Sequence, residues 1–279
     1  MKKISRRSFL AAAGLSVAAL ALTACGGSSA STASSVASSA ASSEAASTSA
    51  AAGELATVEA GKLTMATNAA FPPYEMTTDA GEFEGIDIET AQAIADKLGL
   101  ELQIDDMDFD AALLSVQQGK ADIVMAGVTV TDERKAVMDF SDSYATGIQS
   151  IIVPEGSDIA SPDDLAGKKI GTQRGTTGYI YCSDDFGDDS VVAYDDGLTA
   201  VQALNNGQVD AVVIDNAPAQ EFVAANPGLK ILDTSYAEED YAIGMAKGSS
   251  LEDAVNATLE ELKADGTLQS IVDKYITAE

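Results

Sequence analysis

Residues 85–128, GIDIETAQAIADKLGLELQIDDMDFDAALLSVQQGKADIVMAGV, contain the alternation that decides the fold class. The segment 85–99 carries apolar residues at helical spacing and ends in glycine, a common helix terminator. A strand is expected at 101–107 and an amphipathic helix at 109–119. The run 121–128 is continuously apolar, as buried parallel strands are. This repetition predicts an α/β fold with parallel sheets.

The same alternation restarts further along the chain. Strands are expected at 62–68, 168–173, 190–194, 208–215 and 229–233. Helices are expected to begin near 175 and to span 197–207, 216–226, 250–265 and 267–277. Two successive α/β units of similar plan predict two lobes.

The first 25 residues have a basic start, an apolar run and small residues before Cys25, which is the layout of a lipoprotein signal peptide. The LTAC sequence at 22–25 resembles a lipobox, so we expect Cys25 to be lipidated. The SRRSFLA sequence at 5–11 resembles a twin-arginine signal, although paired arginines also serve the general export route. Residues 26–58, mostly Ala, Ser, Gly and Thr, are expected to form a disordered low-complexity tether.

The composition excludes several classes of function. The chain has 44 Asp and Glu against 16 Lys and Arg, with a net charge of −28 at pH 7, so a nucleic-acid partner is not expected. It has no histidine and two cysteines, which excludes a metal site of several Cys or His. We expect no cofactor, no metal and a monomer, with Cys182 as a small buried apolar group.

Polar residues follow several of the expected strands, where ligands bind in α/β folds. Arg134 is either a surface cation paired with Asp132 or Glu133, or a clamp for a ligand carboxylate. The GTTG turn at 175–178 is either a simple helix cap or an anion-binding turn. Asp215 likewise either caps the next helix or holds a ligand ammonium.

Taken together, these groups match the needs of a buried α-amino acid, because each charge of a buried zwitterion requires a partner. Arg134 and the amides near Thr176 would hold the carboxylate, and Asp215 the ammonium. The remaining contributors would be hydrogen bonds from Thr129 and the carbonyl near Gly127, and a sandwich of two rings from Phe71 and Phe109.

The chain resembles the extracellular solute-binding proteins, family 3, that serve polar amino-acid ABC transporters. The resemblance covers nearly all of residues 60 to 279. It rests on AAFPPYE, GIDIETAQAIADKLG, FDAALLSVQQGKADIVMAGVTVTDERKAVMDFSDSY, DLAGKKIGTQRGTTG, QVDAVVIDN and YAIGMAKG, in family order. It implies a two-lobed, periplasmic-binding-protein-like clamshell, each lobe a mostly parallel sheet flanked by helices, with two hinge strands. Lobe 1 would be 59–146 and 242–279, and lobe 2 would be 147–241.

The resemblance also assigns roles to residues. Carried over position by position, the α-carboxylate would contact Arg134, Thr176 and Thr177. The α-ammonium would contact Asp215, Thr129 and Gly127, and the side chain would lie between Phe71 and Phe109.

Two further positions bear on the ligand's side chain. Asn68 stands where relatives that prefer basic amino acids often carry a carboxylate, which argues against a basic ligand. Arg174 would favour an acidic or polar side chain, or is a solvent-facing cation. Tyr144 and Tyr241 lie near the expected hinge crossings.

The function implied by the resemblance is that of a membrane-anchored substrate-binding component of an ABC importer. It would capture an amino acid between its lobes and deliver it to the permease. Its location would be the extracellular face of the cell membrane, or the periplasm if an outer membrane is present. The alternatives are a sensor for a membrane receptor, or a secreted dehydratase-like enzyme using Glu75 or Glu89 as acid or base.

Overall fold

The computed structural model describes residues 55–276. The expected export signal, the lipidation expected at Cys25 and most of the expected tether lie outside the described residues. The last residues of the expected tether contact the fold, since Leu55 packs against the main apolar cluster and the Val58 amide donates to Asp122 Oδ1 at 2.7 Å. The folded part therefore begins slightly earlier than the composition suggested.

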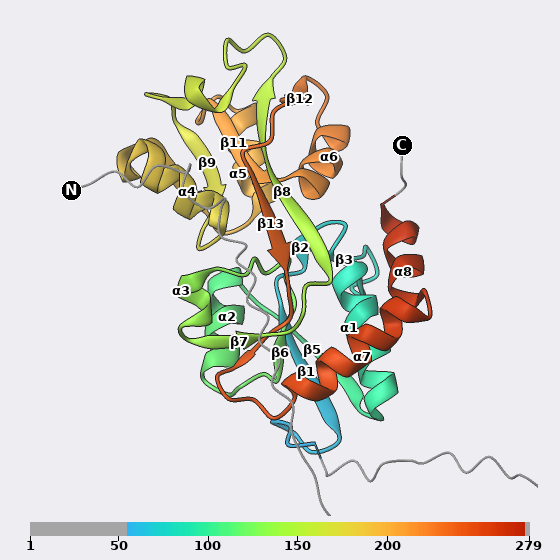
Figure 1. Ribbon diagram of the computed structural model, residues 1–279. Helices are drawn as coiled ribbons and strands as arrows, with labels where there is room; N and C mark the ends of the chain where they lie inside the picture. Colours follow the sequence, from blue (N-terminus) through green and yellow to red (C-terminus); the bar gives the residue numbers. More distant parts are fainter. Residues whose placement is uncertain (1–54, 277–279) are drawn as a thin grey trace, which may run out of the picture. The chain divides into compact units, whose positions relative to one another are not determined.

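The first large sheet has the strand order β5-β1-β6-β14-β7. Its strands are β1 (Lys62–Thr67), β5 (Glu101–Asp106), β6 (Ile123–Val124), β7 (Met138–Phe140) and β14 (Gly244–Ala246). β1 runs parallel to β5 and β6, whereas β14 runs antiparallel to both of its neighbours. Helices lie on both sides of it (Figure 1): α1 (Ile86–Leu98), α7 (Glu252–Ala264) and α8 (Thr267–Tyr275) on one, α2 (Phe109–Gln117) and α3 (Asp132–Lys135) on the other.

The second large sheet has the order β10-β9-β11-β8-β12, with β13 also paired to β8. Its strands are β8 (Ala145–Pro154), β9 (Ile170–Gln173), β10 (Val191–Tyr194), β11 (Ala211–Asp215), β12 (Leu229–Ile231) and β13 (Ala237–Tyr241). Its main helices are α4 (Thr177–Phe186), α5 (Gly197–Asn205) and α6 (Asn216–Ala225). Short 3₁₀ turns span Pro162–Leu165 and Asp188–Ser190.

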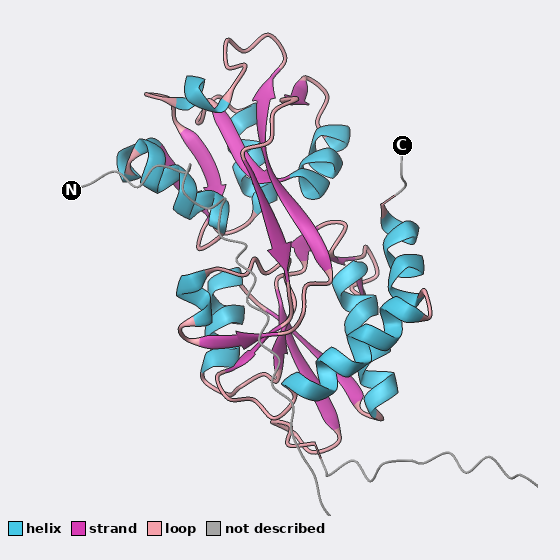
Figure 2. Ribbon diagram, viewed as in Figure 1, coloured by secondary structure: helices cyan, strands magenta, loops and turns pink. Residues whose placement is uncertain are grey.

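Alternation along the strands of this sheet explains why helices cover both of its faces. On β11, Val212 and Ile214 join the apolar cluster that contains residues of α5 and α6. Val213 instead joins the cluster that contains Cys182 of α4. Figure 2 shows the resulting sandwich of strands between helices. Cys182 is fully buried, as expected.

A small third sheet, β2-β3-β4, consists of β2 (Ala70–Phe71), β3 (Glu75–Thr77) and β4 (Phe83–Glu84). It lies just before α1, which begins and ends close to the predicted limits. Gly99 closes α1 in the left-handed conformation, with φ of 70°, as the terminating glycine predicted. No described helix combines the length and the apolar character needed to cross a bilayer.

The two-lobed α/β fold is confirmed, but its sheets are mixed, not mostly parallel. β8 is antiparallel to β11, β12 and β13, and β14 is antiparallel in the other sheet. β8 was not among the expected strands, although it is the longest. The run expected at 121–128 contributes only Ile123–Val124 to its sheet, because the residues after it leave the sheet toward the junction of the lobes.

The chain passes between the two large sheets at two places, from β7 into β8 and from β13 back into β14. β8 and β13 pair with each other there (Figure 1), in a register that places Ala145 opposite Tyr241. The Tyr144 amide donates to the Tyr241 carbonyl at 3.0 Å, and both tyrosines are buried. These two strands therefore form the hinge, while the exact lobe boundaries stay predictions.

Gly147 of β8 allows a close approach that the hinge requires. A methyl group there would lie 2.4 Å from the ring of Tyr241, which is fully buried and cannot swing away. We expect Gly147→Ala to lower the free energy of unfolding by about 1–3 kcal/mol, the usual cost of overpacking. Urea denaturation would measure this, with Thr146→Ala at the exposed neighbouring position as the control. Equal stability of both variants would contradict the described packing.

Candidate functional site

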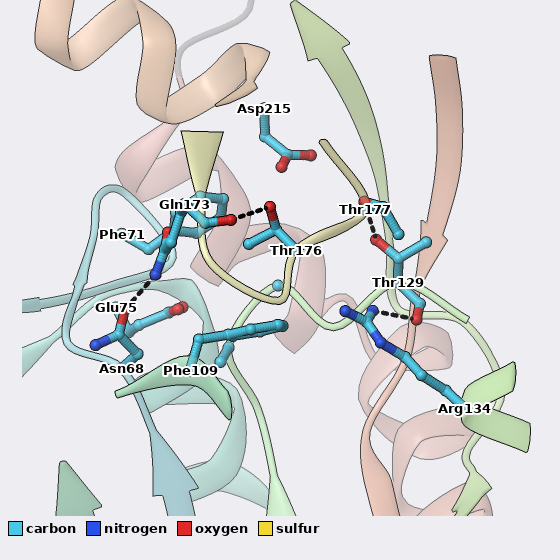
Figure 3. A pocket seen from close by; sticks show the side chains of 12 residues that line it. Asn68, Phe71, Glu75, Phe109, Thr129, Arg134, Gln173, Thr176, Thr177 and Asp215 are labelled. Atoms are coloured by element: carbon cyan, nitrogen blue, oxygen red, sulfur yellow. Dashed lines mark hydrogen bonds between the residues drawn. The ribbon is translucent and has the colours of Figure 1, made fainter. Parts of the chain in front are cut away.

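A narrow cavity lies at the junction of the two lobes; the empty space in it and at its mouth, open solvent included, amounts to about 310 Å³. Every residue predicted to bind a ligand lines it: Asn68, Phe71, Phe109, Gly127, Thr129, Arg134, Thr176, Thr177 and Asp215. Three residues that the sequence analysis did not assign to ligand binding also line it: Glu75, Ala126 and Gln173. Figure 3 shows how these side chains converge from distant segments of the chain.

Arg134 lies in the short helix α3, which begins after Thr131, whose side chain accepts from the Arg134 amide. The Arg134 side chain is only 8% exposed and reaches into the cavity (Figure 3), whereas Asp132 and Glu133 are exposed. The surface-cation alternative is therefore wrong. Because the guanidinium is removed from water, it needs polar partners in the junction.

Those partners come from both lobes. Arg134 Nη1 donates to the carbonyl of Thr129 at 2.7 Å, and Nη2 donates to the carbonyl of Gly175 at 3.2 Å. The guanidinium also lies 5.3 Å from the centre of the Phe109 ring. Burial lowers the pKa of Arg134, and the negative charge of Glu239 opposes that shift. A guanidinium has five N–H donors, so donors remain for a ligand.

The Gly-Thr-Thr turn is the N-terminus of α4. Thr176 caps the helix, because its side chain accepts from the Tyr179 amide at 3.3 Å. The Thr177 side chain donates to Glu239 Oε2 at 2.9 Å. The cap and the anion-binding interpretation are compatible here, since the Thr176 side chain engages only the Tyr179 amide and the helix begins at residues that line the cavity.

Asp215 ends β11 and is 7% exposed. Its side chain makes no capping hydrogen bond to α6, so the helix-cap alternative does not hold. It accepts hydrogen bonds from Gln149 Nε2 at 2.7 Å and from the Tyr241 hydroxyl. Burial raises the pKa of the Asp215 carboxyl to about 7, against the effect of the Tyr241 hydrogen bond. The group is well suited to bind a cation.

The predicted aromatic pair is in place. Phe71 in β2 and Phe109 at the start of α2 both line the cavity (Figure 3). Behind Phe71, Tyr74 stacks at 5.9 Å between ring centres and meets the edge of Tyr241 at 5.3 Å. Gly127 has φ of 55°, and a side chain there would collide with Phe71. The rings and the glycine therefore shape one wall together.

Asn68 and Gln173 close one end of the cavity. Gln173 Nε2 donates to Asn68 Oδ1 at 2.8 Å across the junction (Figure 3), and Asn68 Nδ2 donates to the carbonyl of Met107 at 3.0 Å. Gln173 Nε2 also donates to the Asp195 carbonyl at 3.4 Å, so both of its N–H groups are used, whereas Asn68 Nδ2 uses one of its two. Gln173 ends β9, so the rule that polar residues at strand ends approach the ligand would also have identified it.

Two other charged residues lie outside the cavity. Arg174 is exposed, 3.7 Å from Asp195, and does not line the cavity, so the solvent-facing alternative holds. Glu89 pairs with Lys274 and Tyr275 at the surface of α1 and α8. Of the two acids considered for catalysis, only Glu75 lies at the cavity.

The junction is rich in buried acids. Four are buried there, whereas Arg134 is the only lysine or arginine of the described residues in the buried class; the acids are Glu75, Asp87, Asp215 and Glu239. Asp87 accepts from the Gly127 amide at 3.0 Å and from the Tyr144 hydroxyl at 2.7 Å. Burial raises its pKa to about 6. Burial, and then the charge of Asp87, raise the pKa of Glu75 well above its usual range.

Comparison with known proteins gives consistent matches. The family described as "Bacterial extracellular solute-binding proteins, family 3" matches residues 63–278. The L-cystine-binding protein TcyJ of Escherichia coli K12 is 33% identical over 226 residues, covering 79% of this chain and 85% of that protein. The ABC transporter glutamine-binding protein GlnH of Bacillus subtilis 168 is 34% identical over 202 residues, covering 71% and 74%. The structure of an ancestral arginine-binding protein bound to arginine is 43% identical with a TM-score of 0.74, covering 77% and 98%.

The buried carboxyls predict how stability varies with pH. Asp87 and Asp215 have folded pKa values of about 6 and about 7, above the ordinary value of 3.8. Between pH 4 and 7 the folded state therefore holds more protons than the unfolded state, and the free energy of unfolding falls as the pH rises.

We expect Asp87→Asn to reduce the fall in the free energy of unfolding between pH 4 and 7 by about 1–3 kcal/mol. Asparagine can still accept a hydrogen bond from Gly127 or Tyr144, but it carries no charge. Urea denaturation from pH 4.5 to 8 would measure it. Asp79→Asn, at an exposed position, is the control. A pH profile for Asp87→Asn that parallels the wild type would contradict the described burial.

Proposed function

The chain belongs to the bacterial extracellular solute-binding proteins of family 3, and on that premise we propose that it captures a free α-amino acid between its lobes for uptake. One observation carries the proposal. A buried guanidinium, Arg134, and a buried carboxyl, Asp215, line the same cavity from different lobes, with Phe71 and Phe109 beside them. A zwitterion with a side chain satisfies both charges and both rings.

The carboxylate end would be formed by Arg134 and the start of α4. Arg134 keeps donors beyond the two that bind Thr129 and Gly175. The N-terminus of a helix attracts anions through its dipole and its unpaired amides. Thr176 and Thr177 place these amides at the cavity. A bidentate contact from the guanidinium would add orientation as well as affinity.

The ammonium end would be formed by Asp215, with the Thr129 hydroxyl and the Gly127 carbonyl beside it. A cation close to Asp215 favours the ionised carboxylate over the neutral acid. Binding would therefore lower the pKa of about 7 that burial gives this group. In this scheme the amino acid supplies the positive charge that the acid-rich junction lacks.

The ligand's side chain would lie between Phe71 and Phe109 and end near Asn68, Gln173 and Glu75. Both N–H groups of the Gln173 amide donate to protein acceptors, whereas Asn68 Nδ2 uses one of its two N–H groups. Burial raises the pKa of Glu75 well above its usual range, so its carboxyl can donate a hydrogen bond as well as accept one. This end favours a polar side chain such as that of glutamine, or that of arginine if the cation ionises Glu75.

Uptake would proceed by capture and closure. Arg134 and Asp215 belong to different lobes, so a ligand that bridges them stabilises the closed arrangement. A permease of the ABC type would accept the amino acid from the closed protein. The lipobox at Cys25 would hold the protein at the outer face of the membrane, with the Ala- and Ser-rich segment as its tether.

Calorimetric titration of the purified protein against the twenty amino acids and cystine tests the proposal. The protein would first be unfolded and refolded to remove any amino acid that it carries. We expect tight binding of one amino acid or a few, with glutamine or arginine among them. If no α-amino acid binds, capture of a zwitterion is ruled out.

Arg134→Ala gives the sharper test of the carboxylate contact. Truncating one partner of a buried charge pair costs about 2–5 kcal/mol, so we expect Kd to rise roughly 30-fold or more. Lys135→Ala is the matched control, because Lys135 is the neighbouring cation and is exposed. Unchanged affinity in Arg134→Ala would show that Arg134 does not hold the ligand.

A further inference from the structure

Glu239 is a buried carboxylate that the ligand contacts proposed above do not use. It lies in β13, opposite Gly147 of β8. Its neighbours Glu238 and Asp240 are exposed, whereas Glu239 is 7% exposed. Because successive side chains of a strand point to opposite faces, Glu239 points into the junction while its two neighbours point to solvent. A carboxylate in such a place is costly unless several donors compensate it.

Those donors all converge on one oxygen. Oε2 of Glu239 accepts from Thr129 Oγ1 at 3.0 Å, from Thr177 Oγ1 at 2.9 Å and from Gln149 Nε2 at 3.0 Å. Thr129 lies in the first lobe, close to α3, whereas Thr177 begins α4 in the second. Gln149 lies in β8. One carboxylate in the hinge therefore contacts both lobes and the other hinge strand.

The same carboxylate reaches the proposed ligand groups indirectly. Gln149 uses its amide for both Glu239 and Asp215. The negative charge of Glu239 also acts on the buried guanidinium of Arg134, where it opposes the lowering of the pKa by burial. Any change in the position of Glu239 would therefore alter the electrostatic surroundings of both Asp215 and Arg134.

Opening the cleft must separate Thr129 from Thr177, so it breaks at least one hydrogen bond to Glu239. Hydrogen bonds to a charged group are stronger than those between neutral groups. Three further contacts bridge the lobes among the described residues: Gln173 to Asn68 at 2.8 Å, Arg134 to the Gly175 carbonyl at 3.2 Å, and the Thr129 and Thr177 hydroxyls at 3.5 Å. Glu239 differs from these contacts because it lies in a hinge strand and binds a residue of each lobe at the same time.

We propose that Glu239 is the positioning residue of the cleft: it ties Thr129 to Thr177 and biases the lobes toward closure through protein contacts alone. Its importance for uptake rests on the proposed function, but the bias itself does not require a ligand. A bias toward closure lowers the fraction of molecules that a ligand can enter, and so slows association.

Glu239→Gln tests the proposal, because it removes the charge and keeps the shape. Small-angle X-ray scattering would compare the radius of gyration of the refolded protein without added amino acid. We expect Glu239→Gln and Thr177→Val each to give a larger radius than the wild type. Glu238→Gln, on the exposed face of the same strand, should leave it unchanged. Circular dichroism would verify that every variant is folded.

Non-additivity separates positioning from a general loss of packing. If Thr177 acts through Glu239, the double variant should expand no further than Glu239→Gln alone. Losing one charged hydrogen bond corresponds to a shift of roughly tenfold or more toward the open arrangement. A wild-type radius in both single variants would overturn the proposal.

Stopped-flow binding of L-glutamine and L-arginine provides the second readout. We expect the association rate in Glu239→Gln to rise several-fold, with Glu238→Gln again matching the wild type. An unchanged association rate would contradict the gating role of Glu239. If neither amino acid binds, the proposed function fails in this form, and the scattering comparison still decides the role of Glu239.

Discussion

The burial of charge at the junction of the lobes is the constraint on which the rest of the structure depends. Four carboxyls and one guanidinium are withdrawn from water there, and each would cost several kcal/mol without compensation. Hydrogen bonds compensate Asp87, from a backbone amide and Tyr144, and Asp215, from Gln149 and Tyr241. For Glu75, burial instead raises the pKa, which favours the neutral acid. The surrounding elements are placed so that strand ends, a helix start and two hinge strands supply these partners.

The hinge strands do more than connect the sheets. β8 contributes Gln149, and β13 contributes Glu239 and Tyr241, all three of which touch the charged groups of the junction. Antiparallel pairing between β8 and β13 keeps these side chains in register. A rotation of one lobe about the hinge must therefore disturb the hydrogen bonds of the cavity. Mechanical coupling between hinge and cavity follows from this shared geometry.

Much of this could be predicted from the sequence. The 3.6-residue periodicity of 85–99 located α1, and the glycine at its end behaved as a terminator. The residues predicted to bind the ligand were chosen by their positions after strands and by the family resemblance, and they line one cavity. The periodicity and the strand-end positions are local signals, because they depend on a residue's neighbours in the chain.

What was missed depends on contacts between distant segments. The sequence of β8 lacks a clear alternation of polar and apolar residues, because both faces of the strand are covered. Ser150 to Val153 are all buried, and β8 pairs with three other strands. Glu239 sits in an acidic stretch, AEEDY, that by composition alone resembles an exposed edge. Only its partners across the hinge distinguish it from Glu238 and Asp240. Arg174, by contrast, was given a possible ligand role through proximity in sequence, but its side chain turns to solvent.

The polar character of the junction also explains how such a protein could open at all. A dry apolar interface costs about 25 cal/mol for each Å² exposed to water, which would hold the lobes shut. Hydrogen bonds such as those of Thr129 and Thr177 to Glu239 can instead be exchanged for bonds to water when the lobes separate. Open and closed arrangements can then lie close in free energy. Under that condition, a ligand that bridges Arg134 and Asp215 needs little differential affinity to shift the population.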